Sequence, residues 1–168
     1  MLLYAYYLIE EHITRTDVPC SQYNYQVRNC VLRPRGPSHS GPPILIGARL
    51  PRMLRLAARY ADAWNTVWHI DPKVVQERYA EFQRVCRAVG RDPATIELTA
   101  GTVVRLPQAG EEQGVENVIT GTPEVVANRL RGFADVGVRH LMIVLEPSGV
   151  APIEQFGRVL ELLRSWSV

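Results

Sequence analysis

The spacing of apolar and polar positions changes repeatedly after residue 43, and the changes define a recurring unit. Short apolar runs lie at 44–47, 61–67, 96–106 and 140–145, as expected of strands that are buried on both faces. Each run precedes a segment whose apolar residues recur at helical spacing. These predicted helices span 51–60, 72–89, 123–136 and 151–166. The pattern therefore predicts four strand–helix units in succession.

Residues at the helix ends support these boundaries. Pro51 and Pro72 stand where a first helical residue is expected, and Asp71 is placed to cap the second helix. Gly90 and Gly137 follow the last apolar positions of two helices and are expected to end them. Strand–helix alternation favours an α/β fold with a parallel sheet and right-handed crossovers. Four units fit either a small open sheet or half of a TIM barrel.

The residues before the first unit are less regular. The pattern predicts a helix over 1–12 and an irregular insertion or connector over 13–41, with a hairpin around 23–28 and 30–33. Proline and glycine are frequent from residue 34 to residue 43, which excludes a helix there. We expect residues 1–168 to form a single domain, because this length can bury one core.

Composition excludes several classes of protein. Charged residues make up 21% of the chain, the net charge is +2, and basic residues alternate with acidic ones, which argues against nucleic-acid or membrane binding. The three cysteines are dispersed and odd in number, so a reduced, cytoplasmic chain is expected. The apolar start of nine residues is too short to cross a bilayer.

Two long segments carry a resemblance to a known family. Residues 42–65 read PPILIGARLPRMLRLAARYADAWN, and residues 119–130 read ITGTPEVVANRL before GVRHL at 137–141. The first closely resembles the central signature of luciferase-like monooxygenases, the group of oxidoreductases that depend on a flavin or on coenzyme F-420. The second resembles that family's last helix–strand unit. The resemblance extends over roughly residues 20–166.

The resemblance implies a TIM-barrel-like half barrel. The four units would be strands five to eight of a (β/α)8 barrel, and units one to four would lie before Met1. It also implies FMN or coenzyme F-420 as cofactor and a small molecule as substrate. In similar proteins the turn that corresponds to Gly47, Ala48, Arg49 and Leu50 holds the cofactor phosphate, and the region of Trp64 and Asn65 lies near the cofactor and substrate pocket.

Elementary chemistry agrees with an anion at this turn. Backbone N–H groups at a helix start, together with the helix dipole, favour an anion, and Arg49 or Arg52 can add a charge-assisted bond. The competing interpretation is an ordinary strand–helix turn with solvated arginines.

Three further residues invite a functional and a structural interpretation. His69 is a candidate proton donor because imidazole titrates near neutrality, or it is a loop histidine that caps the next helix or faces water. Trp68 is expected to pack rather than to serve as a stacking platform. Glu146 follows the last strand and either touches substrate or pairs with an arginine.

No metal site is expected, since His12, His39 and His140 form no ligand set.

Three functions remain open. The first is a luciferase-like oxidoreductase. The second is a catalytically inactive half barrel that acts as an association module, because four parallel strands leave two edges and one apolar face uncovered. Such a chain would form a homodimer or pair with a separate N-terminal half. The third is an open α/β phosphate-binding module unrelated to the family.

Overall fold

The computed structural model describes residues 20–22, 25–27, 42–106 and 117–165. The chain divides into two compact units, Met1–Ile44 and Leu45–Val168. In the first unit, β1 (Cys20–Gln22) pairs antiparallel with β2 (Tyr25–Val27). The hairpin was predicted with strands at 23–28 and 30–33. The observed strands begin earlier in the chain, and only two residues separate them. The expected helix over 1–12 and most of the connector lie outside the described residues.

The second unit is built on a parallel sheet. Its main strands are β3 (Leu45–Gly47), β4 (Ala63–Val67), β5 (Glu97–Arg105) and β7 (His140–Glu146). β4 pairs with β3 and β5, and β7 pairs with the other side of β5, so these strands lie side by side in the order of the sequence. A two-residue strand, β6 (Ile119–Thr120), pairs with the end of β5 and was not predicted.

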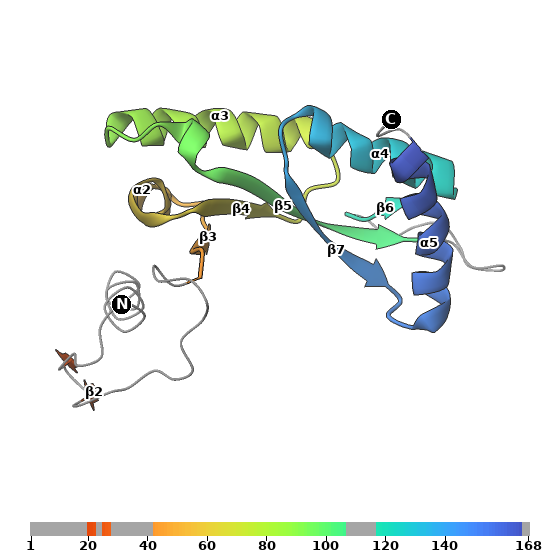
Figure 1. The fold of residues 1–168 in the computed structure, drawn as a ribbon, viewed down its shortest axis with the longest axis horizontal. Coiled ribbons are helices and arrows are strands. Elements are labelled where there is room, and N and C mark those ends of the chain that lie inside the picture. The colour runs from red at the N-terminus through yellow and green to blue at the C-terminus, as the bar shows by residue number, and fades with distance from the viewer. Residues whose placement is uncertain (1–19, 23–24, 28–41, 107–116, 166–168) are drawn as a thin grey trace. The chain divides into compact units, whose positions relative to one another are not determined.

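A helix follows each of the four main strands, as predicted. These helices are α2 (Pro51–Tyr60), α3 (Pro72–Ala88), α4 (Pro123–Asp135) and α5 (Val150–Ser165), and a short 3-10 helix, η1 (Pro93–Thr95), precedes β5. α2 packs against α3, α3 against α4, and α4 against α5. Right-handed crossovers between neighbouring strands place successive helices on one face, and α3 and α4 cover the same face in Figure 1.

The predicted helix boundaries follow from local chemistry. The Asp71 side chain accepts a hydrogen bond from the backbone N–H of Lys73, and the Thr122 side chain accepts one from Val125. Gly90 and Gly137 follow α3 and α4 with positive φ angles of 77° and 94°, which glycine adopts without steric cost.

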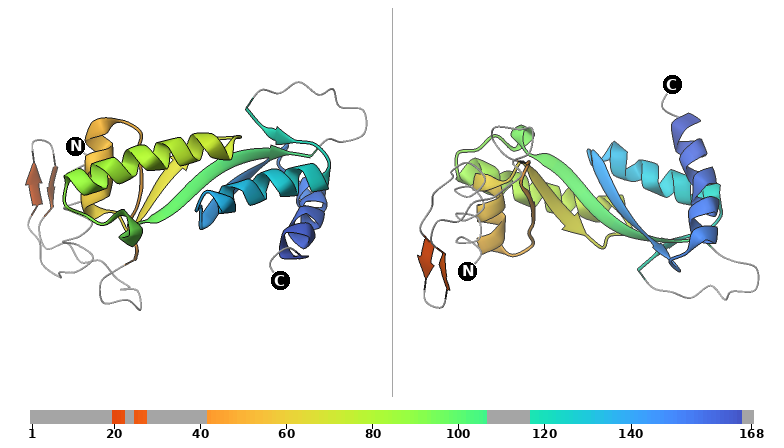
Figure 2. Two further views of the ribbon diagram at one scale, coloured as in Figure 1. Left: turned by 90° about the horizontal axis from the view of Figure 1, so that it is seen from above. Right: turned by 60° about the horizontal axis from the view of Figure 1, so that its bottom comes forward.

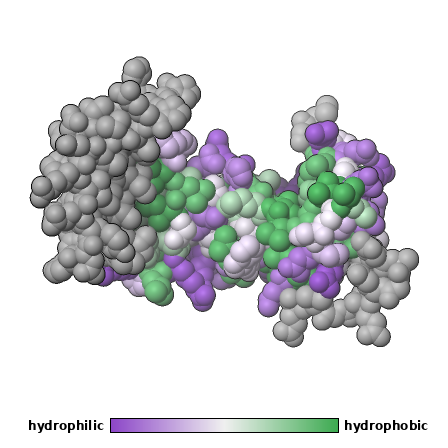
Figure 3. Space-filling model, turned by 90° about the horizontal axis from the view of Figure 1, so that it is seen from below, coloured by the Kyte–Doolittle hydropathy of each residue, from purple (hydrophilic) through white to green (hydrophobic). Residues whose placement is uncertain are grey.

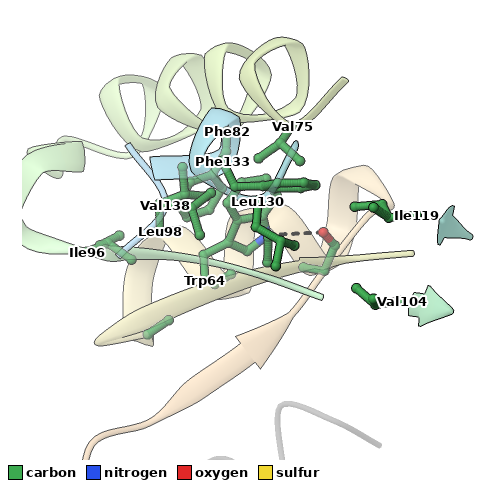
Figure 4. Packing of buried hydrophobic residues seen from close by; sticks show 14 of the residues in the cluster. Trp64, Val75, Phe82, Ile96, Leu98, Val104, Ile119, Leu130, Phe133 and Val138 are labelled. Atoms are coloured by element: carbon green, nitrogen blue, oxygen red, sulfur yellow. Dashed lines mark hydrogen bonds between the residues drawn. The ribbon is translucent and has the colours of Figure 1, made fainter. Parts of the chain in front are cut away.

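The core lies between the helices and the sheet. Figure 4 shows Trp64 of β4 beneath Phe82 of α3, with Phe133 and Leu130 of α4 beside them. The Trp64 and Phe82 rings stack with centroids 4.4 Å apart and planes 12° apart. Trp64 is only 2% exposed, so almost the whole indole contributes to the core.

The opposite face of the sheet carries the alternate residues of each strand. The register aligns Val67, Gly101 and Met142 in one row across β4, β5 and β7. Leu45 is 49% exposed, and Val67 and Val144 are 43% and 41% exposed. No described helix crosses this face in the right-hand view of Figure 2, and Figure 3 shows hydrophobic areas on it between hydrophilic ones. Strands in chain order with helices on one side are also the arrangement of a (β/α)8 barrel wall.

Within the described residues, every helix is too short or too polar to cross a membrane.

Candidate functional site

A pocket of about 640 Å³ lies at the carboxyl ends of β3 and β4. Its wall has four parts: the turn of Gly47–Arg49, Leu54 of α2, the segment 64–69 of β4 and its following loop, and the residues Val74, Arg78 and Glu81 on α3. Carboxyl ends of parallel strands are where α/β enzymes bind ligands, because the loops that follow the strands meet there.

The turn at the start of α2 is suited to an anion. Leu50 is the residue before the helix and offers no side-chain cap, and the first turn contains no acidic residue. The first backbone N–H groups of a helix lack partners within the helix, so an anion can accept hydrogen bonds from them. A Cβ atom built on Gly47 would meet nothing within 4 Å, so the turn is open beside this residue.

Hydrogen bonds from β4 fix the turn. The Ala48 N–H donates to the Asn65 carbonyl at 3.3 Å, and Nε1 of Trp64 donates to the Ala48 carbonyl at 3.0 Å, the bond drawn in Figure 4. Trp64 therefore has its ring in the core and its polar atom on the turn. This explains how a core residue shapes the pocket.

Asn65 brings an unsatisfied polar atom to the pocket. Its side chain is 9% exposed, and Oδ1 has no hydrogen-bond partner. Nδ2 lies 3.9 Å from Sδ of Met142 on β7, two strands away across β5. A buried amide oxygen without a donor is costly, so a hydrogen-bond donor that reached this atom would stabilise the site.

His69 lies in the loop after β4 and is held in place by several contacts. One ring nitrogen, Nε2, is 2.7 Å from Oγ1 of Thr66. The backbone N–H groups of Trp68 and His69 both donate to the Gly101 carbonyl, at 3.0 and 3.3 Å. Burial lowers the pKa of His69 below its ordinary value, and the charges of Arg78 and then Arg49 lower it further. The ring is therefore neutral at physiological pH.

The structure brings most of the predicted site residues together. Gly47, Ala48, Arg49, Trp64, Asn65 and His69 all line the pocket, whereas Leu50 lies outside its lining and is 68% exposed. The expectation that Trp68 packs is wrong: its side chain is 60% exposed and its φ angle is 59°. The core position on this strand is already filled by Trp64, and the left-handed backbone directs the chain into the loop at the pocket.

Sequence reasoning missed the contribution of α3. Val74, Arg78 and Glu81 are spaced four and three residues apart, so they share one face of this helix. That spacing was visible in the sequence, but which face of α3 meets the pocket depends on how the helix packs.

Glu146 pairs with an arginine, one of its two expected roles. Its Oε2 lies 3.6 Å from Nη2 of Arg105, its register partner on β5. Nε of Arg105 is buried and has no partner. In the part of the chain that the structure describes, no three histidine, cysteine or acidic side chains are grouped to hold a metal ion.

Comparison with known proteins gives this geometry a context. The chain is 30% identical over 105 residues to a phthiodiolone/phenolphthiodiolone dimycocerosates ketoreductase of Mycobacterium tuberculosis, a match that covers 60% of this chain and 27% of the relative. The structure is similar to an F-420-dependent secondary alcohol dehydrogenase in complex with an F-420–acetone adduct, with a TM-score of 0.75 and 15% identity over 98% of this chain and 61% of that one.

It is also similar to a long-chain alkane monooxygenase, with a TM-score of 0.68 and 14% identity over 90% of this chain and 47% of that one. The chain thus spans less than two thirds of the length of these relatives. At these identities, the likeness to the dehydrogenase and to the alkane monooxygenase shows the fold alone. That fold is an α/β fold with a parallel sheet and four helices, similar to luciferase-like TIM barrels. The model of the family of luciferase-like monooxygenases matches residues 8–112, well over half of the chain. The chain therefore belongs to the luciferase-like monooxygenase family.

Proposed function

We propose that this chain supplies the cofactor-phosphate side of a flavin- or deazaflavin-dependent oxidoreductase or monooxygenase. The phosphate of coenzyme F-420 or FMN would bind at Gly47–Leu50. The observation that carries the proposal is the pocket at the carboxyl ends of β3 and β4, which Arg49 and Asn65 line beside the uncapped start of α2. Similar proteins whose names include F-420-dependent and monooxygenase activities support it.

The residues of the pocket fit a phosphorylated cofactor. Arg49 and the first N–H groups of α2 provide positive charge and donors for a phosphate. The free Oδ1 of Asn65 accepts a hydrogen bond, which a hydroxyl of the cofactor can donate. When bound, the cofactor would carry hydride or activate oxygen, and this chain would bind and orient it beside a small-molecule substrate.

The same proposal assigns β3, β4, β5 and β7 to strands five to eight of a (β/α)8 barrel. The chain order of these four strands, and α3 and α4 on one face of them, support this assignment. The other four strands would come from an N-terminal half or be replaced by a second copy of this chain. Either partner would cover the exposed apolar side chains of the open face.

The cofactor proposal is tested by titration of the purified chain with FMN and coenzyme F-420, followed by fluorescence. We expect binding of at least one of them, and weaker binding of riboflavin, which has no phosphate. Arg49→Glu should weaken binding about tenfold or more, because it replaces a charge-assisted bond by repulsion. Arg55→Glu makes the same charge change on α2, outside the pocket lining, and should have little effect.

Two results would contradict the cofactor proposal. One is the absence of binding of either cofactor at high micromolar concentration. The other is an equal response of affinity to Arg49→Glu and Arg55→Glu, which would mean that only the general charge of the helix matters.

A second candidate function is a catalytically inactive half barrel that serves as an association module. The exposed apolar side chains Leu45, Val67 and Val144 on the open face favour it. Size-exclusion chromatography with light scattering tests the association shared by both proposals, for which we expect a dimer. A well-folded monomer would contradict that expectation, and a dimer without cofactor binding would favour the inactive module.

A further inference from the structure

Basic groups from three parts of the chain line the same pocket. Arg49 comes from the turn before α2, His69 from the loop after β4, and Arg78 from α3. The remaining charged residue of the pocket wall is Glu81, also on α3, and β4 contributes the uncharged Asn65 and Thr66. The described wall therefore has more positive than negative groups around His69.

The pairing between Arg78 and Glu81 leaves much of this positive charge available. Nη1 of Arg78 lies 3.4 Å from Oε2 of Glu81, and the side chains are 38% and 41% exposed. An ion pair this long and this accessible to water contributes little free energy, so a better acceptor can compete for the arginine. Arg78 can thus turn toward an anion in the pocket without losing a strong partner.

The position of the His69 ring is fixed by its surroundings. Thr66, which is 8% exposed, contacts Nε2 with its hydroxyl, and the loop is tied to the Gly101 carbonyl by two backbone N–H groups. A Cβ atom on residue 101 would lie 2.8 Å from Cγ1 of Val67, so glycine leaves room for the Val67 side chain just before this loop. The Thr66 contact and the anchored loop thus place the ring in the wall that Arg49 and Arg78 also line.

The two arginines oppose a positive charge on His69. Burial is the larger cause of its lowered pKa, and the charges of Arg78 and Arg49 add to it. An anion between these groups would remove the repulsion and add attraction to an imidazolium. We propose that this pocket holds a doubly charged anionic group, such as a phosphate, between Arg49 and Arg78, and that His69 takes up a proton when it binds.

This inference rests on the proposed function for the identity of the natural ligand. It deepens that function by assigning a role to His69. The direction of the effect follows from linkage. An anion raises the pKa of His69 in the complex relative to the free protein, so binding consumes a proton. Affinity must then increase as the pH falls toward the range in which the bound form of His69 is charged.

Sulfate is a suitable probe because it stays a dianion throughout the relevant pH range, so a change of affinity with pH belongs to the protein. We would titrate the full chain with sulfate by calorimetry between about pH 5.5 and about pH 8. At each pH, two buffers of different ionisation enthalpy would give the number of protons taken up. We expect binding about five- to tenfold tighter at the acidic end, with net proton uptake.

Two variants separate His69 from other titrating groups. His69→Gln keeps a polar side chain but cannot take up the proton, so its sulfate affinity should be nearly independent of pH. His140→Gln is the control, because His140 lies on β7 outside the pocket wall, and it should keep the pH dependence of the unmodified chain. Arg78→Gln should weaken sulfate binding and reduce proton uptake.

The outcomes distinguish this inference from the cofactor proposal. The role of His69 is overturned if the sulfate affinity of the unmodified chain does not change with pH. It is also overturned if the affinity changes equally in His69→Gln. Both conclusions hold even if FMN or coenzyme F-420 binds. Absence of sulfate binding also overturns it. Proton-linked sulfate binding that disappears in His69→Gln supports the inference, and it does so even if neither cofactor binds.

Discussion

Trp64→Phe tests how far the core and the pocket depend on one hydrogen bond. The substitution keeps an aromatic ring to stack on Phe82, but it removes Nε1, which donates to the Ala48 carbonyl at 3.0 Å. Ala48 is 9% exposed, so its carbonyl would be left unpaired with little access to water. Such a loss costs about 1–3 kcal/mol.

A second contribution comes from the smaller ring. Trp64 is 2% exposed, so nearly all of the area that phenylalanine lacks is buried in the native protein. A difference of about 40 Å² at about 25 cal/mol per Å² adds about 1 kcal/mol. We therefore expect Trp64→Phe to lower the free energy of unfolding by about 2–4 kcal/mol.

Trp68→Phe is the matched control, four residues along the same segment. Trp68 is 60% exposed, so the same substitution should change the free energy of unfolding by less than about 0.5 kcal/mol. Urea unfolding followed by far-ultraviolet circular dichroism is the appropriate assay, because both variants alter tryptophan fluorescence. Equal losses in the two variants, or a loss below about 0.5 kcal/mol in Trp64→Phe, would refute the assignment of the bond.

Three further predictions concern single side chains. Arg91 donates to Thr95 and to the carbonyls of Arg59 and Ala61. Arg91→Ala should therefore lower the free energy of unfolding, measured in urea, by about 1–3 kcal/mol, and Arg91→Lys should lower it by less. Thr102 is fully buried and its hydroxyl has no partner, so Thr102→Val should raise the free energy of unfolding by about 1 kcal/mol. A lower melting temperature of this variant would contradict the absence of a hydrogen bond to Thr102. The lowered pKa of His69 means that the unfolded chain binds its proton more readily. Stability should therefore fall as the pH drops below 6.5, and His69→Gln should flatten that dependence in melting curves recorded across the pH range.

The sequence by itself determined the four main strands and four helices of the second unit and several of the helix ends, but not β6 or η1. Pro51, Pro72, Asp71 and Gly90 act on the backbone next to them, so their effects could be inferred from neighbouring residues alone. The hairpin was located less well, because strand register depends on which segments pair across the turn.

The sequence also indicated the turn at Gly47 and the residue His69, which end or follow predicted strands, and the family resemblance indicated Trp64 and Asn65. Carboxyl ends of parallel strands meet at one edge of a sheet, so their proximity could be expected without coordinates.

Only the tertiary structure decided how these residues contact one another. Asn65 and Met142 are 77 residues apart in sequence and meet across β5, while packing turns Arg78 of α3 toward the pocket. The exposure of Trp68 followed from a core already filled by Trp64, which no local pattern records. Periodicity and capping act over a few residues, whereas burial and long-range contacts arise only when the whole sheet is assembled. For that reason the sequence located the pocket, and the tertiary structure determined which charges meet in it.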